Sequence, residues 1–167
     1  MKYSDIYRLY STSQPKDAIH QALREVPVDD SDEQYEDRSP LHLACQYGDT
    51  EGVKILLERD AEPNTKDANG STPIHILGRT SAGCADEDKL KEIAVMLIEQ
   101  GANIPRSAKN TTALIECIRN RHFKMAEAII DSGARVNSTD LNGENVLFGF
   151  CACLLYTSPS PRDLSTS

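Results

Sequence analysis

The stretch SPLHLACQYGDTEGVKILLERDAEPNTKDANG (residues 39–70) is followed by TPIHILGRT (residues 72–80), so Ser-Pro-Leu-His recurs as Thr-Pro-Ile-His 33 residues later. A further copy, TALIECIRNRHFKMAEAIIDSGARVNSTDLNG, begins at Thr112, and NVLF at Asn145 begins another one 33 residues on. A fixed period of this length is typical of repeat proteins, in which each unit packs against its neighbours. The period by itself therefore predicts a repeat protein.

The residue types within each unit predict two short helices and a projecting hairpin. Ser39 or Thr72 followed by proline marks a helix start, because the hydroxyl caps free N–H groups and proline fills a first-turn place where no N–H is needed. The segment TEGVKILLERDAEPN predicts a second helix, with Val53, Leu56 and Leu57 at helical spacing. A Gly-Ala or Asp-Ala pair then marks its C-terminal turn, and Asp-x-Asn-Gly marks a tight turn at the hairpin tip.

These residues resemble the ankyrin repeat, whose motif Thr-Pro-Leu-His-x-Ala is nearly matched by residues 39–44 and is begun by residues 72–75. The resemblance extends from Ser39 to about Ala152. It implies an all-α solenoid of stacked helix-turn-helix units with projecting hairpin loops, truncated in the fourth motif-bearing repeat. It also implies that the motif histidines, His42 and His75, are structural and bond to neighbouring backbone in the hairpin region.

The sequence departs from the family pattern at a few positions. The unit that begins at Thr112 has Ala113 in place of proline and Ile115 in place of histidine. Gly52 interrupts the second helix of the first unit, where the family usually has an apolar residue. We therefore expect these units to be individually weak and to gain their stability from contacts with neighbouring units.

On this interpretation the chain has three parts. Residues 1–38 predict N-terminal capping helices and an acidic hairpin, with an apolar side available to cover the first repeat, formed by Ile6, Leu9, Ile19, Ala22 and Leu23. The repeats occupy residues 39–152, at about 39–71, 72–111, 112–144 and a partial unit at 145–152. The second repeat is eight residues longer from its capping threonine to its Gly-Ala turn, which predicts a surface insertion near residues 79–90 between its paired helices.

The third part, residues 153–167, has a different character. The segment from Cys153 to Asp163 resembles the translation of an adaptor used to prepare DNA sequencing libraries, and it interrupts the fourth repeat after its first helix. We therefore expect an artefactual or disordered tail, and a natural protein that continues into further repeats. A genuine flexible Ser/Pro tail is the alternative.

Composition and charge exclude several classes of function. A net charge of −8 argues against a nucleic-acid backbone as the main partner, and the absence of Trp argues against a large aromatic-lined cavity. The chain has neither a signal-peptide core nor 18 consecutive apolar residues, so we expect a cytoplasmic protein without membrane insertion, or one in a host cytosol if it is a secreted effector. The cysteines are odd in number and lack CxxC spacing, which indicates reduced and mostly buried thiols at Cys45, Cys84, Cys117, Cys151 and Cys153.

Three groups of residues could form a catalytic or metal-binding site, but a structural or solvent-exposed role explains each of them more simply. His42 and Cys45 could form a nucleophile or part of a zinc site, but the recurrence of the histidine at period 33 favours stacking. The acidic stretch of Asp29, Asp30, Asp32, Glu33, Glu36 and Asp37 lacks the glycine and register of a calcium loop, although weak cation binding stays open. The insertion carboxylates Asp86, Glu87 and Asp88 lack pocket-forming neighbours. We expect no catalytic residue, cofactor or metal.

What remains is a surface formed by hairpin tips and the exposed sides of the first helices, where partners of the family usually lie. The positions of this sequence that match that surface are Tyr35, Glu36, Arg38, Gln46, Tyr47, Lys66, Ala68, Asn69, Ser71, Arg79, Thr80, Arg106, Lys109, Arg119 and Asn120. The surface is acidic near residues 29–37 and basic from Arg79 to Arg119.

The hypothesis that follows is a non-catalytic protein-protein interaction module, monomeric when correctly capped, that binds a protein through these positions. One alternative is that the repeats are the targeting or substrate-recruiting region of a larger enzyme or effector, whose catalytic part lies beyond the truncated C-terminus. A purely structural spacer is a further alternative.

Overall fold

A computed structural model describes residues 2–12, 14–80, 86–103 and 112–133. Within these ranges the chain forms α-helices and one short 3₁₀ helix. In chain order they are α1 (Tyr3–Ser11), α2 (Lys16–Glu25), η1 (Glu33–Tyr35), α3 (Pro40–Gln46), α4 (Thr50–Glu58), α5 (Pro73–Gly78), α6 (Glu87–Glu99), α7 (Ala113–Arg119) and α8 (Phe123–Asp131). The predicted fourth repeat, the tail at 153–167 and three cysteines (Cys84, Cys151 and Cys153) lie outside the described residues.

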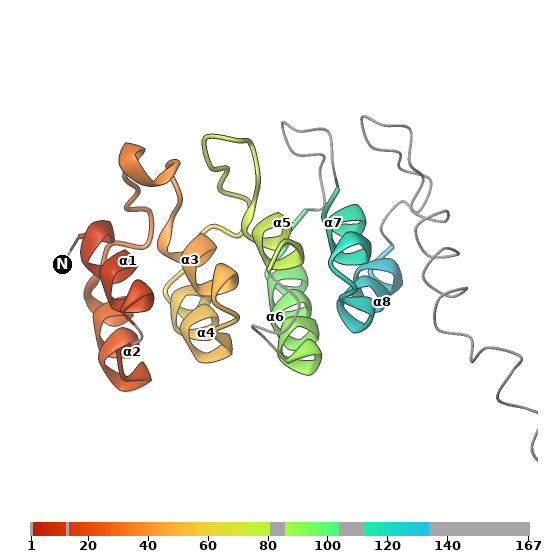
Figure 1. The fold of residues 1–167 in the computed structure, drawn as a ribbon, viewed down its shortest axis with the longest axis horizontal. Coiled ribbons are helices and arrows are strands. Elements are labelled where there is room, and N and C mark those ends of the chain that lie inside the picture. Colours follow the sequence, from red (N-terminus) through yellow and green to blue (C-terminus); the bar gives the residue numbers. More distant parts are fainter. Residues whose placement is uncertain (1, 13, 81–85, 104–111, 134–167) are drawn as a thin grey trace, which may run out of the picture.

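The helices form four antiparallel pairs that stack side by side into an elongated array (Figure 1). The first helices of the pairs, α1, α3, α5 and α7, contact one another in order, and so do the second helices, α2, α4, α6 and α8. The two fully described loops between pairs, residues 26–39 and 59–72, project from the same edge of the array, above the first helices in the view of Figure 1. The prediction of an all-α solenoid is confirmed.

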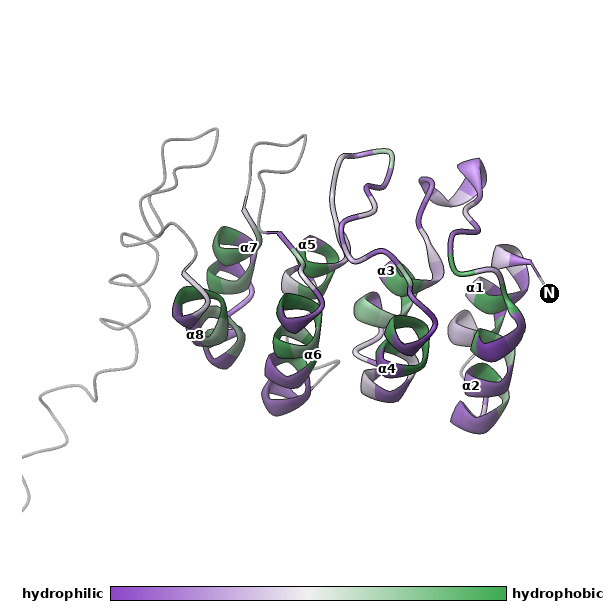
Figure 2. Cartoon of the chain, turned by 180° about the vertical axis from the view of Figure 1, so that it is seen from behind, coloured by the Kyte–Doolittle hydropathy of each residue, from purple (hydrophilic) through white to green (hydrophobic). Residues whose placement is uncertain are grey.

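The core is a continuous layer of mainly aliphatic side chains between successive pairs. Figure 2 shows that the helices carry both apolar positions (green) and polar positions (purple). Its largest fully buried aliphatic members are Ile6, Leu23, Leu41, Leu43, Leu56, Ile74, Leu77, Leu90, Ile93, Leu97 and Leu114. Burying one such side chain contributes about 1.5–3 kcal/mol. Because these residues come from every pair, no pair has a core of its own.

The N-terminal helices lie in the stack as a further pair. Ile6, Ile19, Ala22 and Leu23 are buried as expected, and Leu9 is half-buried. The guanidinium of Arg59, at the end of α4, donates hydrogen bonds to the carbonyl oxygens at the end of α2. A cation at the C-terminal end of a helix satisfies carbonyls that have no intrahelical partner, so Arg59 joins the two units.

The predicted helix starts are confirmed. Pro40 and Pro73 are the first residues of α3 and α5, and Ser39 and Thr72 precede them in extended conformation. Thr112 caps α7, since its hydroxyl oxygen accepts a hydrogen bond from the N–H of Ile115 at 3.3 Å. The third unit thus keeps its capping threonine although it lacks the proline and the histidine of the motif.

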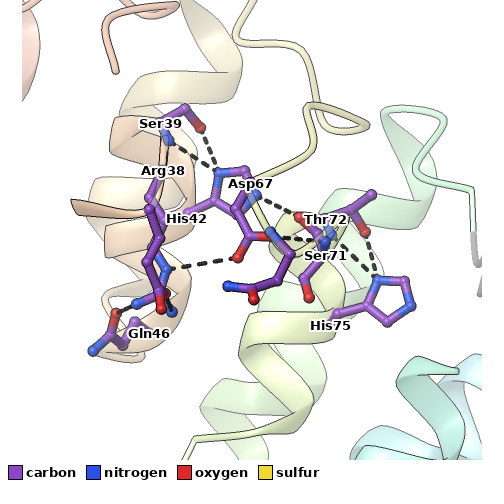
Figure 3. Close-up of polar contacts among 10 residues, drawn as sticks. Arg38, Ser39, His42, Gln46, Asp67, Ser71, Thr72 and His75 are labelled. Atoms are coloured by element: carbon purple, nitrogen blue, oxygen red, sulfur yellow. Dashed lines mark hydrogen bonds and ion pairs between the residues drawn. The ribbon is translucent and has the colours of Figure 1, made fainter. Parts of the chain in front are cut away.

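His42 links one repeat to the next loop through both nitrogens of its ring (Figure 3). Its Nδ1 accepts a hydrogen bond from the N–H of Ser39 at 3.1 Å, so Nε2 carries the proton and donates to the carbonyl oxygen of Ser71 at 3.0 Å. Burial lowers the pKa of His42 to about 4, which keeps the ring neutral at pH 7. The structural role expected for this histidine is therefore confirmed.

The loop before α5 ends in the predicted tight turn. The Oδ1 atom of Asp67 accepts hydrogen bonds from the N–H groups of Asn69 and Ser71 at 2.9 and 2.8 Å, and Gly70 has a φ of 67°. The N–H of Ala68 also donates to the carbonyl of Glu36 in the preceding loop, at 2.8 Å. Successive hairpins therefore contact each other through backbone as well as through the helices below them.

The insertion in the second repeat is partly helical. Helix α6 has 13 residues, whereas α4 and α8 have nine each. The sequence suggested a loop between the paired helices, but part of the extra length extends α6, which is capped by Asp86. Its Asp88 and Lys91 form ion pairs with Lys124 and Glu127 of α8. Residues 81–85 lie outside the described ranges.

We expect the substitution Asp60→Gly to stabilise the protein by about 0.5 kcal/mol, because Asp60 holds a φ of 62° that glycine adopts without a Cβ clash. The equivalent turns of the next two units have Gly101 and Gly133, at φ values of 87° and 90°. The reciprocal change Gly101→Asp should destabilise by about 1 kcal/mol. Urea unfolding measures both, and equal stabilities of the three proteins would contradict the assignment.

The free energy of unfolding should fall as the pH is lowered from about 6.5 to about 4, because the unfolded chain protonates His42 in this window and the folded chain does not. This single group accounts for about 3 kcal/mol at most. Urea unfolding at several pH values, with His42→Asn as the comparison, measures the effect. The variant should be less stable at pH 7 and should lose less stability on acidification, whereas parallel pH profiles would show that His42 is not the group responsible.

Candidate functional site

The first part of the predicted surface lies where the N-terminal pair meets the first repeat. Tyr35 ends η1, Glu36 and Arg38 follow it, and Gln46 and Tyr47 lie at the end of α3. The Arg38 guanidinium donates to the carboxylate of Glu36 and, at 2.8 Å, to the side-chain oxygen of Gln46.

Asp67 of the next hairpin faces the same arginine. Its carboxylate oxygen Oδ2 forms an ion pair with Nε of Arg38 at 3.7 Å (Figure 3). The arginine thus hydrogen-bonds to Glu36 and Gln46 and pairs in charge with Asp67, so it connects two loops and one helix.

Two predicted surface residues are not available to a partner. Ser71 and Thr80 are 1% and 5% exposed, so their assignment to the binding surface was wrong. The backbone carbonyl of Ser71 accepts the hydrogen bond of His42, and the carbonyl of Thr80 lies 2.7 Å from Nε2 of His122. Both residues therefore connect successive repeats, a role that the motif spacing alone does not reveal.

The remaining predicted positions are distributed along the array. Lys66 and Arg119 are exposed, while Asn69 and Arg79 are half-buried. Asn120 is half-buried as well, because its amide group donates to the carbonyl oxygens of Gly78 and Glu116 at 3.0 and 2.9 Å. Arg106 and Lys109 lie outside the described residues. Among the described positions, those that contact one another lie mainly near the N-terminal end of the array, around η1 and the end of α3.

A group of tyrosines covers that N-terminal end. The rings of Tyr7 and Tyr35 have centroids 4.3 Å apart, and Tyr3 lies 5.7 Å from Tyr35. The rings of Tyr10 and Tyr47 stack in parallel at 4.9 Å, and Tyr47 is 39% exposed. We call these five residues the tyrosine platform.

Sequence reasoning identified only Tyr35 and Tyr47 of this group. The missed signal was the spacing of Tyr3, Tyr7 and Tyr10, which places three rings on one side of a helix.

A buried polar network fixes the platform from below. The hydroxyl of Tyr10 donates to Asp49 at 2.8 Å, and Nε2 of His20 lies 3.0 Å from the same carboxylate. Asp49 also caps α4 by accepting from the N–H of Gly52 at 3.2 Å. Burial, and then the nearby carboxylate of Asp49, raises the pKa of Tyr10, so its hydroxyl stays protonated and remains a donor.

This network explains the unusual glycine in α4. A Cβ atom at position 52 would lie 2.5 Å from Oδ2 of Asp49 and 2.9 Å from the hydroxyl oxygen of Tyr10. Both distances are shorter than a carbon–oxygen contact allows, so any other residue would displace the hydrogen-bonded pair. The departure at Gly52 thus leaves room for the network.

The residues considered for catalysis are engaged in structural contacts. Both ring nitrogens of His42 have backbone partners, and Cys45 is fully buried. Burial raises the pKa of the thiols of Cys45 and Cys117, so neither is a ready nucleophile at pH 7.

Two of the acidic positions, Asp30 and Asp32, accept hydrogen bonds from backbone N–H groups. The carboxylate of Asp30 accepts from the N–H of Tyr3 at 2.8 Å, and Asp32 accepts from Gln34 at 2.9 Å. No three His, Cys, Asp or Glu side chains in the described ranges converge in a way that could hold a metal ion. Among the same residues, every helix is too short or too polar to span a bilayer.

Comparison with known proteins finds a family match for part of the chain. Residues 22–77, from within α2 to α5, match the family model of ankyrin repeats. This match begins at residue 22, ahead of Ser39, the residue at which the sequence predicts the start of the first repeat.

The chain is also similar to a transient receptor potential cation channel subfamily A member 1 homolog of Caenorhabditis elegans. The two are 38% identical over 69 residues, and the aligned segment covers 41% of this chain and 6% of that protein.

Two further relatives match a larger share of the chain. Ankyrin repeat protein nuc-2 of Neurospora crassa is 26% identical over 156 residues, or 89% of this chain and 13% of that protein. Neurogenic locus notch homolog protein 1 of Mus musculus is 34% identical over 108 residues, or 64% of this chain and 4% of that protein. The chain therefore spans only a small part of the length of each relative.

We expect Gly52→Ala to lower the free energy of unfolding by about 1 kcal/mol, because the loss of buried hydrogen bonds outweighs the gain in helix propensity. In the background Tyr10→Phe/Asp49→Ala, which lacks both obstructing oxygen atoms, the same substitution should instead stabilise by about 0.5–1 kcal/mol. Urea unfolding of the four proteins measures this reversal of sign. Stabilisation by alanine in both backgrounds would contradict the proposed role of Gly52.

Proposed function

Because residues 22–77 match the family model of ankyrin repeats and the helices stack in pairs, we propose that this chain is a non-catalytic module that binds another protein through its hairpin loops and the exposed side of its first helices. The observation that supports the proposal most directly is the tyrosine platform with the Arg38 contacts beside it. Tyrosine and arginine are enriched among the residues that dominate binding energy at protein interfaces.

The rigidity of this region also favours binding. Tyr47 lies against the buried ring of Tyr10, whose hydroxyl is held by Asp49. Tyr35 contacts both Tyr3 and Tyr7. The Arg38 guanidinium donates hydrogen bonds to Gln46 and Glu36 and lies within ion-pair distance of Asp67. A partner therefore meets side chains that are already ordered, which reduces the entropy cost of association.

The second candidate function is recruitment on behalf of a longer protein. The relatives carry their matching segments within much longer chains, since this chain spans 13% of nuc-2 and 4% of the notch homolog. In such an arrangement the repeats select a partner, and an activity located elsewhere in the polypeptide acts on it. The complete gene in the source DNA distinguishes the two candidates, because a stop codon soon after one capping repeat would rule out the second.

We expect the double substitution Tyr35→Ala/Tyr47→Ala to reduce recovery of the natural partner by about tenfold or more, since truncating interface anchors costs about 2 kcal/mol or more. The matched control is Lys54→Ala/Glu58→Ala, two exposed positions on the second helix α4 of the same repeat. Quantitative pull-down from a lysate of the source organism provides the measurement. Circular dichroism and thermal unfolding confirm that each variant is folded, and undiminished recovery by the tyrosine variant would rule out this face.

A further inference from the structure

The charge around the tyrosine platform has one predominant sign. From Pro27 to Arg38 the loop contains six carboxylates and a single basic residue, Arg38. That arginine is already bound to Glu36 and faces the carboxylate of Asp67. Asp29 and Glu33 are exposed on the same loop. The platform is therefore bordered by carboxylates whose charge is not fully compensated within the described residues.

The exposed tyrosine rings, like the carboxylates, attract positively charged groups. One face of Tyr47 rests on Tyr10 at an interplanar angle of 11°, so the exposed 39% of Tyr47 lies away from that contact. The π face of an aromatic ring carries partial negative charge and attracts a guanidinium or ammonium group. Arginine in particular stacks on such a ring through its planar side and can bind a carboxylate through its edge.

One buried hydroxyl of the platform also lacks a partner. Tyr3 is 1% exposed, its ring lies 5.7 Å from that of Tyr35, and its hydroxyl makes no hydrogen bond with the described residues. Asp32 and Arg38 are the charged groups close enough to influence it. Buried hydroxyls are normally hydrogen-bonded, so the Tyr3 hydroxyl is a free donor and acceptor for a polar group of a partner that reaches it.

We infer that the partner presents a basic, arginine-containing extended segment, whose guanidinium groups lie on Tyr47 and Tyr35 and pair with the carboxylates of residues 29–37. The inference rests on the proposed function and specifies the chemistry of its partner. The net charge of −8 favours the approach of such a segment, and an acidic segment would be repelled by the same loop.

The first experiment compares peptides that differ in charge alone. A short fluorescent peptide of alternating arginine and serine is titrated with the full chain, beside a peptide in which citrulline, the uncharged analogue, replaces every arginine. The arginine peptide should bind saturably and at least about tenfold more tightly, because citrulline lacks both ionic pairing and cation–π attraction. Equal affinity for the two peptides, or tighter binding of a matching glutamate peptide, would overturn the inference.

The second experiment separates this site from general attraction to an acidic protein. Asp29→Asn/Glu33→Gln should weaken the arginine peptide by about threefold, whereas Glu51→Gln/Glu58→Gln removes the same charge from exposed positions of α4 and should have little effect. Equal losses from the two pairs would show that binding is nonspecific and would overturn the inference.

A ring-specific variant completes the test. Tyr47→Leu keeps an apolar side chain, removes the π face and should weaken the arginine peptide by about threefold. The δ-methylene protons of the peptide arginines should shift upfield on binding to the wild type and less on binding to Tyr47→Leu, as measured by NMR at saturation. An unchanged affinity and shift in that variant would contradict binding on the ring.

The outcome also separates this inference from the proposed function. If the arginine peptide fails to bind but Tyr35→Ala/Tyr47→Ala still loses its natural partner, the surface is correct and the basic partner is wrong. If the tyrosine variant keeps its natural partner as well, the surface itself is wrong.

Discussion

The contact between neighbouring helix pairs is the constraint on which the whole structure depends. The described α-helices have only 6 to 13 residues, a length at which an isolated helix is marginal in water. They are stabilised because Leu41, Leu56 and their equivalents are buried between successive pairs. Directional links such as His42 to Ser71 then fix the register, so that the loops project along one edge.

Much of the fold follows from local chemistry that the sequence displays. The Ser-Pro and Thr-Pro pairs predict the starts of α3 and α5, because capping depends on residues that are adjacent in the chain. The extended helix α6 was not predicted, since a loop and an added helical turn have similar polar composition. Gly52 was recognised as unusual, but its reason depends on Tyr10, 42 residues away.

The candidate surface was predicted in outline and less well in detail. Motif spacing places a residue in a loop, but it does not tell whether the side chain faces solvent, which is why Ser71 and Thr80 were assigned wrongly. The contribution of α1 was missed because the family motif begins later in the chain. The helical spacing of Tyr3, Tyr7 and Tyr10 is the signal in the sequence that indicates it.

Two of the hydrogen bonds between repeats share a feature that affects how the sequence can change. In each, the donor is a specific side chain, His42 or Asn120, whereas the acceptor is the backbone carbonyl of Ser71 or Gly78. Every residue type supplies that carbonyl, so the hydrogen bond itself demands a particular amino acid on one side only. Mutation can therefore change an accepting loop residue such as Ser71 without removing the hydrogen bond, and the array can acquire new surfaces without losing its architecture.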